Sequence, residues 1–398
     1  MFFGLFWFLA GSGWAIWLPS LAKKPEPAAA VAKPDPESML IEIYKHLGAS
    51  RLRDAEAKAN ELVQAYPDFR LGQLIRGDLL LMRTRPVTTL GAVNGSKEKL
   101  GNLREEAMAR LQSFRERPHP GVVPRAILRL REDQKHALVV DAKRSRLYVY
   151  ENRRGQLKLT TDYYISQGKL GVNKLKPGGR KTPIGVYYIT SRLPGTQLPD
   201  SYGSGALPIN YPNEWDRLND RSGSGVWLHG TSPDSYSHPP HSSGGGVVLP
   251  NPDLDKLYEE IEVGKTPIII SEQVEFVNKA KWNRERKLAA RLVDEWRRDA
   301  ESLNPARLRQ NYSMHFRSDS GENLATWFEK QRHALSGVKK LSITLRDLTL
   351  FLYPGREDLI VGTFTEETRA GKRRSSVRKR QYWAKEGAHW KIIWETNL

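Results

Sequence analysis

The spacing of apolar residues changes near His136, and this change constrains the fold more than any other feature of the sequence. Before it, apolar side chains recur at the spacing of amphipathic helices. After it, they alternate or run together in short segments rich in β-branched and aromatic residues. A chain of 398 residues is long enough for several hydrophobic cores. We therefore expect a multidomain α+β protein.

The beginning of the chain is strongly apolar. Residues 2–18 contain no charged side chain, and residues 20–22 resemble a leader-peptidase site, although no Lys or Arg precedes the apolar run. Residues 1–22 are therefore expected to be a signal peptide or membrane anchor. Residues 23–36, rich in Pro, Ala and Lys, are expected to be a linker. These features predict a periplasmic, secreted or inner-membrane-anchored protein.

Residues 37–130 are predicted to be an α-helical region that resembles a tetratricopeptide-type (TPR-like) unit. Apolar residues recur at helical spacing over residues 39–47 and 52–63, and a third run covers residues 71–82. A single unit cannot bury both faces of its helices, so we expect it to pack on a neighbouring domain.

The period of two predicts strands after residue 136, with a helix over residues 253–261. A charged stretch over residues 272–284 is expected to link this domain to a last unit over residues 285–398. That unit is predicted to contain helices near residues 288–303 and 304–315. The strand-like segments follow this order: 137–141, 146–151, 157–166, 185–191, 225–229, 245–249, 266–270, 341–349, 358–366, 375–385 and 388–395.

Charge and cysteine content limit the possible functions. The chain has 63 Lys and Arg against 45 Asp and Glu, a net charge of +18, which favours an anionic partner such as nucleic acid, lipid headgroups or an acidic cell-wall polymer. Cysteine is absent, which excludes disulfides, thiolate metal ligands and a thiol nucleophile.

Three segments of the middle region are informative together. They are Asp141 with residues 147–150 (Leu-Tyr-Val-Tyr), residues 181–187 (Lys-Thr-Pro-Ile-Gly-Val-Tyr), and residues 227–231 (Trp-Leu-His-Gly-Thr) followed by residues 243–251. In this order and spacing, residues 136–271 resemble the L,D-transpeptidase (YkuD) catalytic domain. The resemblance implies a mainly-β domain that acts on peptidoglycan stem peptides, with no cofactor and no metal.

The resemblance also implies site residues. His229 matches the catalytic histidine, and Gly246 occupies the position of the nucleophilic cysteine. Gly230, Ser243, Gly244, Gly245 and Asn251 match positions expected to contact the substrate. Val248 stands where many members carry an arginine. Because glycine has no side chain, an acyl-enzyme cannot form at residue 246.

The residues around Gly246 leave three other kinds of site to weigh: a serine nucleophile, a metal site and a phosphate loop. Ser242 and Ser243 are nearby hydroxyls, but the alternation of the chain points them away from position 246. His238 and His241 could join His229 in a metal site, or could belong to a surface loop. The glycine run is not followed by Lys-Ser/Thr and a helix, which argues against a phosphate loop. The Gly- and Pro-rich insertion over residues 194–224 is expected to be either a substrate-covering loop or packing decoration.

The last unit, residues 285–398, contains Val293–Trp296, Tyr312 with Phe316, and an aromatic strand over residues 388–395. In these features it resembles the NTF2-like, Cds6-type α+β cone, and the resemblance implies an apolar binding pocket. The basic clusters at residues 372–374 and 378–380 favour glycan or anionic-lipid contact, with a solvated strand face as the alternative. An exported chain meets little nucleic acid, which argues against nucleic acid as a partner.

Two hypotheses about function follow. In the first, the protein is a catalytically impaired pseudoenzyme that binds peptidoglycan stem peptides and serves cell-wall biogenesis and cell shape, with membrane or envelope-protein contacts through its flanking modules. In the second, it is an active L,D-transpeptidase, or a stem-peptide amidase or carboxypeptidase. The second requires that Gly246 be an altered residue of this particular sequence or that the nucleophile come from elsewhere.

Overall fold

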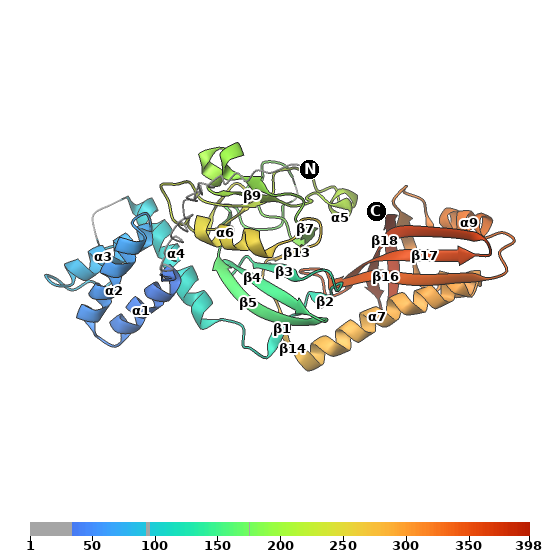
Figure 1. The fold of residues 1–398 in the computed structure, drawn as a ribbon, viewed down its shortest axis with the longest axis horizontal. Coiled ribbons are helices and arrows are strands. Elements are labelled where there is room, and N and C mark those ends of the chain that lie inside the picture. The colour runs from blue at the N-terminus through green and yellow to red at the C-terminus, as the bar shows by residue number, and fades with distance from the viewer. Residues whose placement is uncertain (1–33, 93–95, 175) are drawn as a thin grey trace, which may run out of the picture.

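The computed structural model describes residues 34–92, 96–174 and 176–398. Its three units follow one another along the longest axis of the molecule, from the N-terminal helices to the C-terminal sheet (Figure 1). The expected leader, and nearly all of the expected linker over residues 23–36, lie outside the described residues. In the part of the chain that the structure describes, no helix is long and apolar enough to cross a membrane.

In the described residues, the N-terminal unit consists of four helices, and the first three lie at the positions that the apolar spacing predicts. Asp35 caps the first helix by accepting a hydrogen bond from the Ser38 amide at 2.8 Å, and Ser96 caps the last. Apolar residues such as Ile43, Leu62 and Leu71 form a core of their own. The helices are α1 (Pro36–Gly48), α2 (Leu52–Ala65), α3 (Arg70–Leu81) and α4 (Lys97–Arg115).

The middle unit packs two sheets around a shared core. One sheet has the strand order β5-β4-β3-β13-β7 and the other β12-β10-β9-β8, with β11 and β6 paired beside them. Side chains from both sheets meet helix α6 (Asn251–Glu260) in one hydrophobic core. The strands are β3 (His136–Asp141), β4 (Arg146–Arg153), β5 (Gln156–Tyr164), β6 (Gln167–Gly168), β7 (Gly185–Tyr188), β8 (Leu193–Pro194), β9 (Gly205–Pro208), β10 (Trp227–His229), β11 (His241–Ser243), β12 (Val247–Val248) and β13 (Pro267–Ser271); the short helix α5 spans Glu214–Leu218.

The C-terminal unit is a long curved sheet packed on a long helix. The strand order is β15-β19-β18-β17-β16-β2, where β2 is the short strand Ile127–Arg129. The buried face of α7 packs against this sheet through Ala289, Val293 and Trp296 (Figure 1). The elements are α7 (Lys279–Glu301), α8 (Pro305–Arg309), β15 (Tyr312–Ser318), α9 (Leu324–Ala334), β16 (Leu341–Leu352), β17 (Leu359–Ala370), β18 (Arg373–Glu386) and β19 (His389–Asn397). The last four strands confirm the sequence-based prediction.

The structure corrects three predicted elements. Within the expected helical region 37–130, strands β1 (Val122–Pro124) and β2 (Ile127–Arg129) replace helix. The expected linker 272–284 contains β14 (Phe276–Asn278) and the start of α7. The helix expected over residues 304–315 ends at Arg309, and β15 follows. Strands of three residues are too short to show alternation, and their partners are distant in sequence.

These unexpected strands join the middle and C-terminal units. β1 pairs with β14, and β2 pairs with β16 at the edge of the C-terminal sheet. The Trp282 indole donates a hydrogen bond to the Ile127 carbonyl at 2.6 Å. Trp215 of the middle unit stacks on Tyr382 of the C-terminal unit, with ring centroids 4.3 Å apart. One hydrophobic core therefore runs across the junction.

Candidate functional site

Parallel pairing of β10 and β12 brings His229 and Gly246 together. Leu228 pairs with Val247 and His229 with Val248, so the residue before β12 lies next to the end of β10. A β-carbon built on Gly246 would lie 3.3 Å from Nε2 and 3.2 Å from Cδ2 of His229. Any side chain at position 246 would therefore begin in contact with the imidazole.

Backbone geometry shows that position 246 is also tight. The same β-carbon would lie 2.8 Å from the Trp227 carbonyl oxygen, closer than real β-carbons approach. Because that neighbour is backbone, a larger residue at 246 requires the loop or β10 to move. The structure thus accommodates glycine at this position without strain.

The protonation of His229 follows from its hydrogen bond. Nδ1 lies 2.8 Å from the Gly230 carbonyl oxygen, and since a carbonyl oxygen only accepts, Nδ1 carries the proton. Nε2, which faces Gly246, is then the basic nitrogen of the neutral ring. Burial lowers the pKa of His229 against the opposing effect of the Gly230 hydrogen bond, and His238 lowers it slightly further, so the neutral form is favoured.

Ser243 holds the loop that follows β11. Its buried Oγ donates to the Gly246 carbonyl at 2.6 Å and accepts from the Gly245 amide at 3.0 Å. Ser242 is exposed and donates to the Pro239 carbonyl at 2.8 Å. Both hydroxyl protons therefore go to carbonyl groups, and neither goes to a base. Gly244 is exposed, while Gly245 has φ +127°, a conformation that favours glycine.

Asn251 connects three backbone segments beside His229. Its Oδ1 accepts from the amides of Ser204 (3.0 Å) and Thr231 (3.1 Å), and its Nδ2 donates to the Thr231 carbonyl (2.8 Å). A β-carbon on Gly230 would lie 2.0 Å from Oδ1, so only glycine fits there. These contacts position the loop after His229, and the substrate-contact role of Asn251 and Gly230 stays a prediction.

The insertion over residues 194–224 lies against His229. Tyr202 contacts the imidazole edge-on, with ring centroids 5.0 Å apart, and packs on Trp227 at 5.1 Å. The Tyr202 carbonyl accepts from the Gly230 amide at 3.1 Å. The insertion is evident in the sequence but the position of Tyr202 is not, because an aromatic residue in a loop without periodicity carries no positional signal.

Lys174, a residue that no sequence pattern marks, is buried next to Gly245. Only 5% of the residue is exposed, and a β-carbon on Gly245 would lie 3.7 Å from its Nζ. The ammonium lies 5.4 Å from the centroid of the Tyr211 ring. Burial lowers the pKa of Lys174.

Two other histidines, His238 and His241, lie in the chain between His229 and Gly246. The His238 carbonyl accepts from Tyr164 at 2.9 Å and from Ser166 at 2.8 Å, and His241 is exposed. Over the described residues, no group of three or more His, Asp or Glu side chains could hold a metal ion. His229, His238 and His241 therefore do not form a metal site.

The N-terminal helices hold the loop that follows His229. Tyr236 packs between Tyr66 and Phe69, with ring centroids 5.2 and 5.0 Å away. Ser237 donates to the buried Glu106 carboxylate of α4 at 2.6 Å. The loop between His229 and Ser243 is thus anchored on the helical unit, which confirms that this unit packs on its neighbour.

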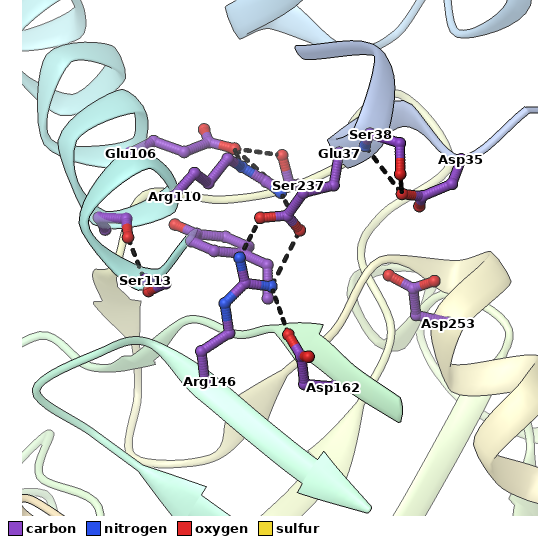
Figure 2. A network of polar contacts seen from close by, with 12 residues as sticks. Asp35, Glu37, Ser38, Glu106, Arg110, Ser113, Arg146, Asp162, Ser237 and Asp253 are labelled. Carbon is purple, nitrogen blue, oxygen red and sulfur yellow. Dashed lines mark hydrogen bonds and ion pairs between the residues drawn. The ribbon is translucent and has the colours of Figure 1, made fainter. Parts of the chain in front are cut away.

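Figure 2 shows that Ser237 is one end of a buried charge network. Arg110 bonds Glu106 at 3.0 Å and Glu37 at 3.2 Å, and Glu37 also pairs with Arg146. Burial raises the pKa of Glu106 despite the opposing effect of Arg110, whereas Arg146 and Arg110 lower the pKa of Glu37 against its burial. The network joins α1 and α4 to β4 beneath the site loop.

Comparisons with known proteins agree with this architecture. Residues 135–270 match the family model described as the L,D-transpeptidase catalytic domain, YkuD, and residues 288–396 match the Cds6 C-terminal NTF2-like domain. No curated protein matches the chain.

Two solved structures resemble most of the chain. Bd1075 from Bdellovibrio bacteriovorus is 28% identical, with a TM-score of 0.61, over 69% of this chain and 98% of that one. Pgp2 from Campylobacter jejuni, described as a helical cell shape determining protein, is 19% identical, with a TM-score of 0.59, over 68% of this chain and 95% of that one. The likeness to Pgp2 is one of fold.

Proposed function

The chain carries an L,D-transpeptidase catalytic domain followed by a Cds6-type NTF2-like domain, and we propose that it binds peptidoglycan stem peptides without forming an acyl-enzyme. On this proposal it works in the bacterial periplasm, and its loss alters cell shape by changing how the wall is built. The apolar run over residues 2–18 supports export.

One observation carries the proposal. Position 246 lies where a side chain would contact Nε2 of His229, yet the residue there is glycine. Acyl transfer by a thiol enzyme requires a nucleophile whose proton passes to the adjacent base and whose sulfur then bonds the carbonyl carbon. Here the base nitrogen and the loop are in place and the attacking atom is missing. Such a site favours non-covalent binding.

The second hypothesis, an active enzyme of the same fold, needs a substitute nucleophile. The candidate nearest in sequence, Ser243, donates its hydroxyl proton to the Gly246 carbonyl and accepts from Gly245. A serine becomes nucleophilic when its proton is shared with a base, and Ser243 lacks that arrangement. The intact surroundings of His229 are the observation that favours this alternative.

Incubation with purified peptidoglycan sacculi tests the proposal. We expect the wild-type protein to co-sediment with sacculi and to leave the muropeptide profile, measured by chromatography and mass spectrometry, unchanged. A new cross-link or a lost terminal D-alanine would overturn the non-catalytic reading. The His229→Ala variant is the matched control, since any product that persists in it comes from a contaminating enzyme.

A further inference from the structure

We propose that the outer end of the C-terminal sheet docks on a membrane surface rich in anionic phospholipid headgroups. This end, the basic tip, lies where β17 turns into β18, remote from the N-terminal helices (Figure 1). The tip belongs to a different unit from His229, so this role goes beyond the proposed function. Its cationic residues are Lys339, Lys340, Arg369, Lys372, Arg373 and Arg374.

Strand register brings these cations to one place. Arg369 lies directly opposite Arg374, one pair before the hairpin turn that contains Lys372. On the other side of β17, β16 begins at Leu341 and pairs with the end of β17. Residues 339–340 directly precede that pair, so cations from three neighbouring segments meet at the same end of the sheet.

The opposed arginines weaken the isolated fold. Side chains directly opposite each other on antiparallel strands are close neighbours, and like charges at such positions destabilise the sheet. Arg369 and Arg374 occupy such positions, and both are exposed. A negative charge supplied from outside the chain would relieve their repulsion.

The acidic residues of β17 do not neutralise the tip. Glu367 pairs with Arg346 at 2.9 Å, and Glu366 pairs with Lys379 at 2.6 Å. All six side chains of the basic tip are exposed, and in the part of the chain that the structure describes none of them takes part in an ion pair. The tip therefore concentrates uncompensated positive charge in a chain whose net charge is +18.

The residue types at the tip favour phosphate-bearing headgroups as the partner. Arginine and lysine bind phosphate through charge-assisted hydrogen bonds, and clusters of them are attracted to anionic bilayers. Residues 339–342 and 368–378 contain no aromatic side chain. Single-stranded nucleic acid stacks on aromatic rings, and the centres of protein interfaces are enriched in them, so both partners fit less well.

A bilayer also matches the distribution of the charges. Cations placed around an exposed end of a sheet can meet many headgroups at once, whereas a small anion needs convergent groups in a pocket. The apolar run over residues 2–18, expected to be a leader or anchor, would bring the chain to a bilayer during export.

Vesicle co-sedimentation of the full chain tests the docking surface. The probes are vesicles of phosphatidylglycerol with phosphatidylethanolamine, and vesicles of phosphatidylcholine alone. Insertion of the apolar run would occur in both, so the difference in binding measures the contribution of charge. We expect tighter binding to the anionic vesicles, and a preference that falls as salt rises because salt screens the charges.

Two double variants locate the charge that matters. Arg369→Gln with Arg374→Gln should weaken binding to anionic vesicles about twentyfold, since each cation near an anionic surface contributes a factor of about five. Lys97→Gln with Lys99→Gln removes the same charge from the exposed start of α4 and should bind as the wild type does. The tip variant should melt at or above the wild-type temperature, because it removes a like-charge pair.

The outcomes separate this surface from the proposed function. Equal binding of the wild-type protein to the two kinds of vesicle, or equal losses in the two double variants, would overturn the docking surface. The tip variant should still co-sediment with peptidoglycan sacculi. Loss of sacculus binding with unchanged vesicle binding would assign the tip to the wall polymer and overturn the proposal, whereas wild-type protein that binds vesicles but not sacculi would overturn only the proposed function.

Discussion

At the scale of single residues, the site is defined by Gly246 and the groups that it faces. The Gly246 backbone approaches His229 and the Trp227 carbonyl so closely that a β-carbon is not accommodated without movement. The missing side chain thus has two effects, since it removes the nucleophile and lets the two strands approach.

Restoring a thiol tests how much of the catalytic geometry remains. We expect Gly246→Cys to lose about 1–3 kcal/mol of the free energy of unfolding, because a small-to-large change in a tight site shifts backbone. It should nevertheless form a covalent adduct with a carbapenem, detected as a mass increase, because Nε2 of His229 can accept the thiol proton.

Gly246→Ala is the matched control, since it adds the same β-carbon without sulfur. It should lose similar stability and form no adduct. A folded Gly246→Cys protein that never gains mass would show that His229 no longer serves as a base for position 246.

Asp253, in the first turn of α6, carries a testable pH dependence. Burial raises its pKa from 3.8 to about 6. Below the lower value both the folded and unfolded states are protonated, and above the higher value the folded state bears the full penalty of a buried carboxylate. The stability associated with Asp253 is therefore present at low pH and lost as pH rises through about 6.

Asp253→Asn should accordingly be more stable than wild type at neutral pH, by about 1–3 kcal/mol at most. The gain should vanish near pH 4, which is roughly the pKa of an unperturbed aspartate. Denaturant unfolding between about pH 4 and neutral pH measures this gain in the free energy of unfolding, and Asp255→Asn on the exposed face of the same helix is the control. A gain that does not change with pH would contradict the assignment.

At the scale of elements, the loop between β10 and β11 depends on the N-terminal helices. Ser237→Ala leaves the buried Glu106 carboxylate with one donor fewer, so we expect a loss of about 1–3 kcal/mol. Ser242→Ala, which removes an exposed hydroxyl from β11, should change stability by less than about 0.5 kcal/mol. Equal effects of the two substitutions on denaturant unfolding would show that the helical unit does not hold the loop.

Part of the fold and of the site could be predicted from the sequence alone. The helices before residue 83 and the long C-terminal strands follow from periodicity. The resemblance around His229 assigned His229 and Gly246 to the positions of the catalytic histidine and the nucleophile, and these roles stay predictions. The strands β1, β2 and β14 were missed because they are three residues long and are stabilised by distant partners. Tyr202 and Lys174 were missed because each reaches the site from an irregular loop, where no periodicity marks which side chain turns inward.

At the scale of the whole molecule, the middle and C-terminal units share a core and should unfold together. Trp215→Ala removes the ring stacked on Tyr382 and should cost about 3–5 kcal/mol. Leu218→Ala, exposed on the same helix, should cost little. We expect one calorimetric transition for both units, shifted by Trp215→Ala as a whole; two separate transitions, with only one shifted, would contradict a shared core.

The most direct test of a binder without a nucleophile is a mass-spectrometric time course of a purified disaccharide tetrapeptide mixed with the wild-type protein. We expect the muropeptide to be bound while no free D-alanine, no new linkage and no covalent protein species accumulates. Steady release of D-alanine that stops when His229 is replaced by alanine would contradict it.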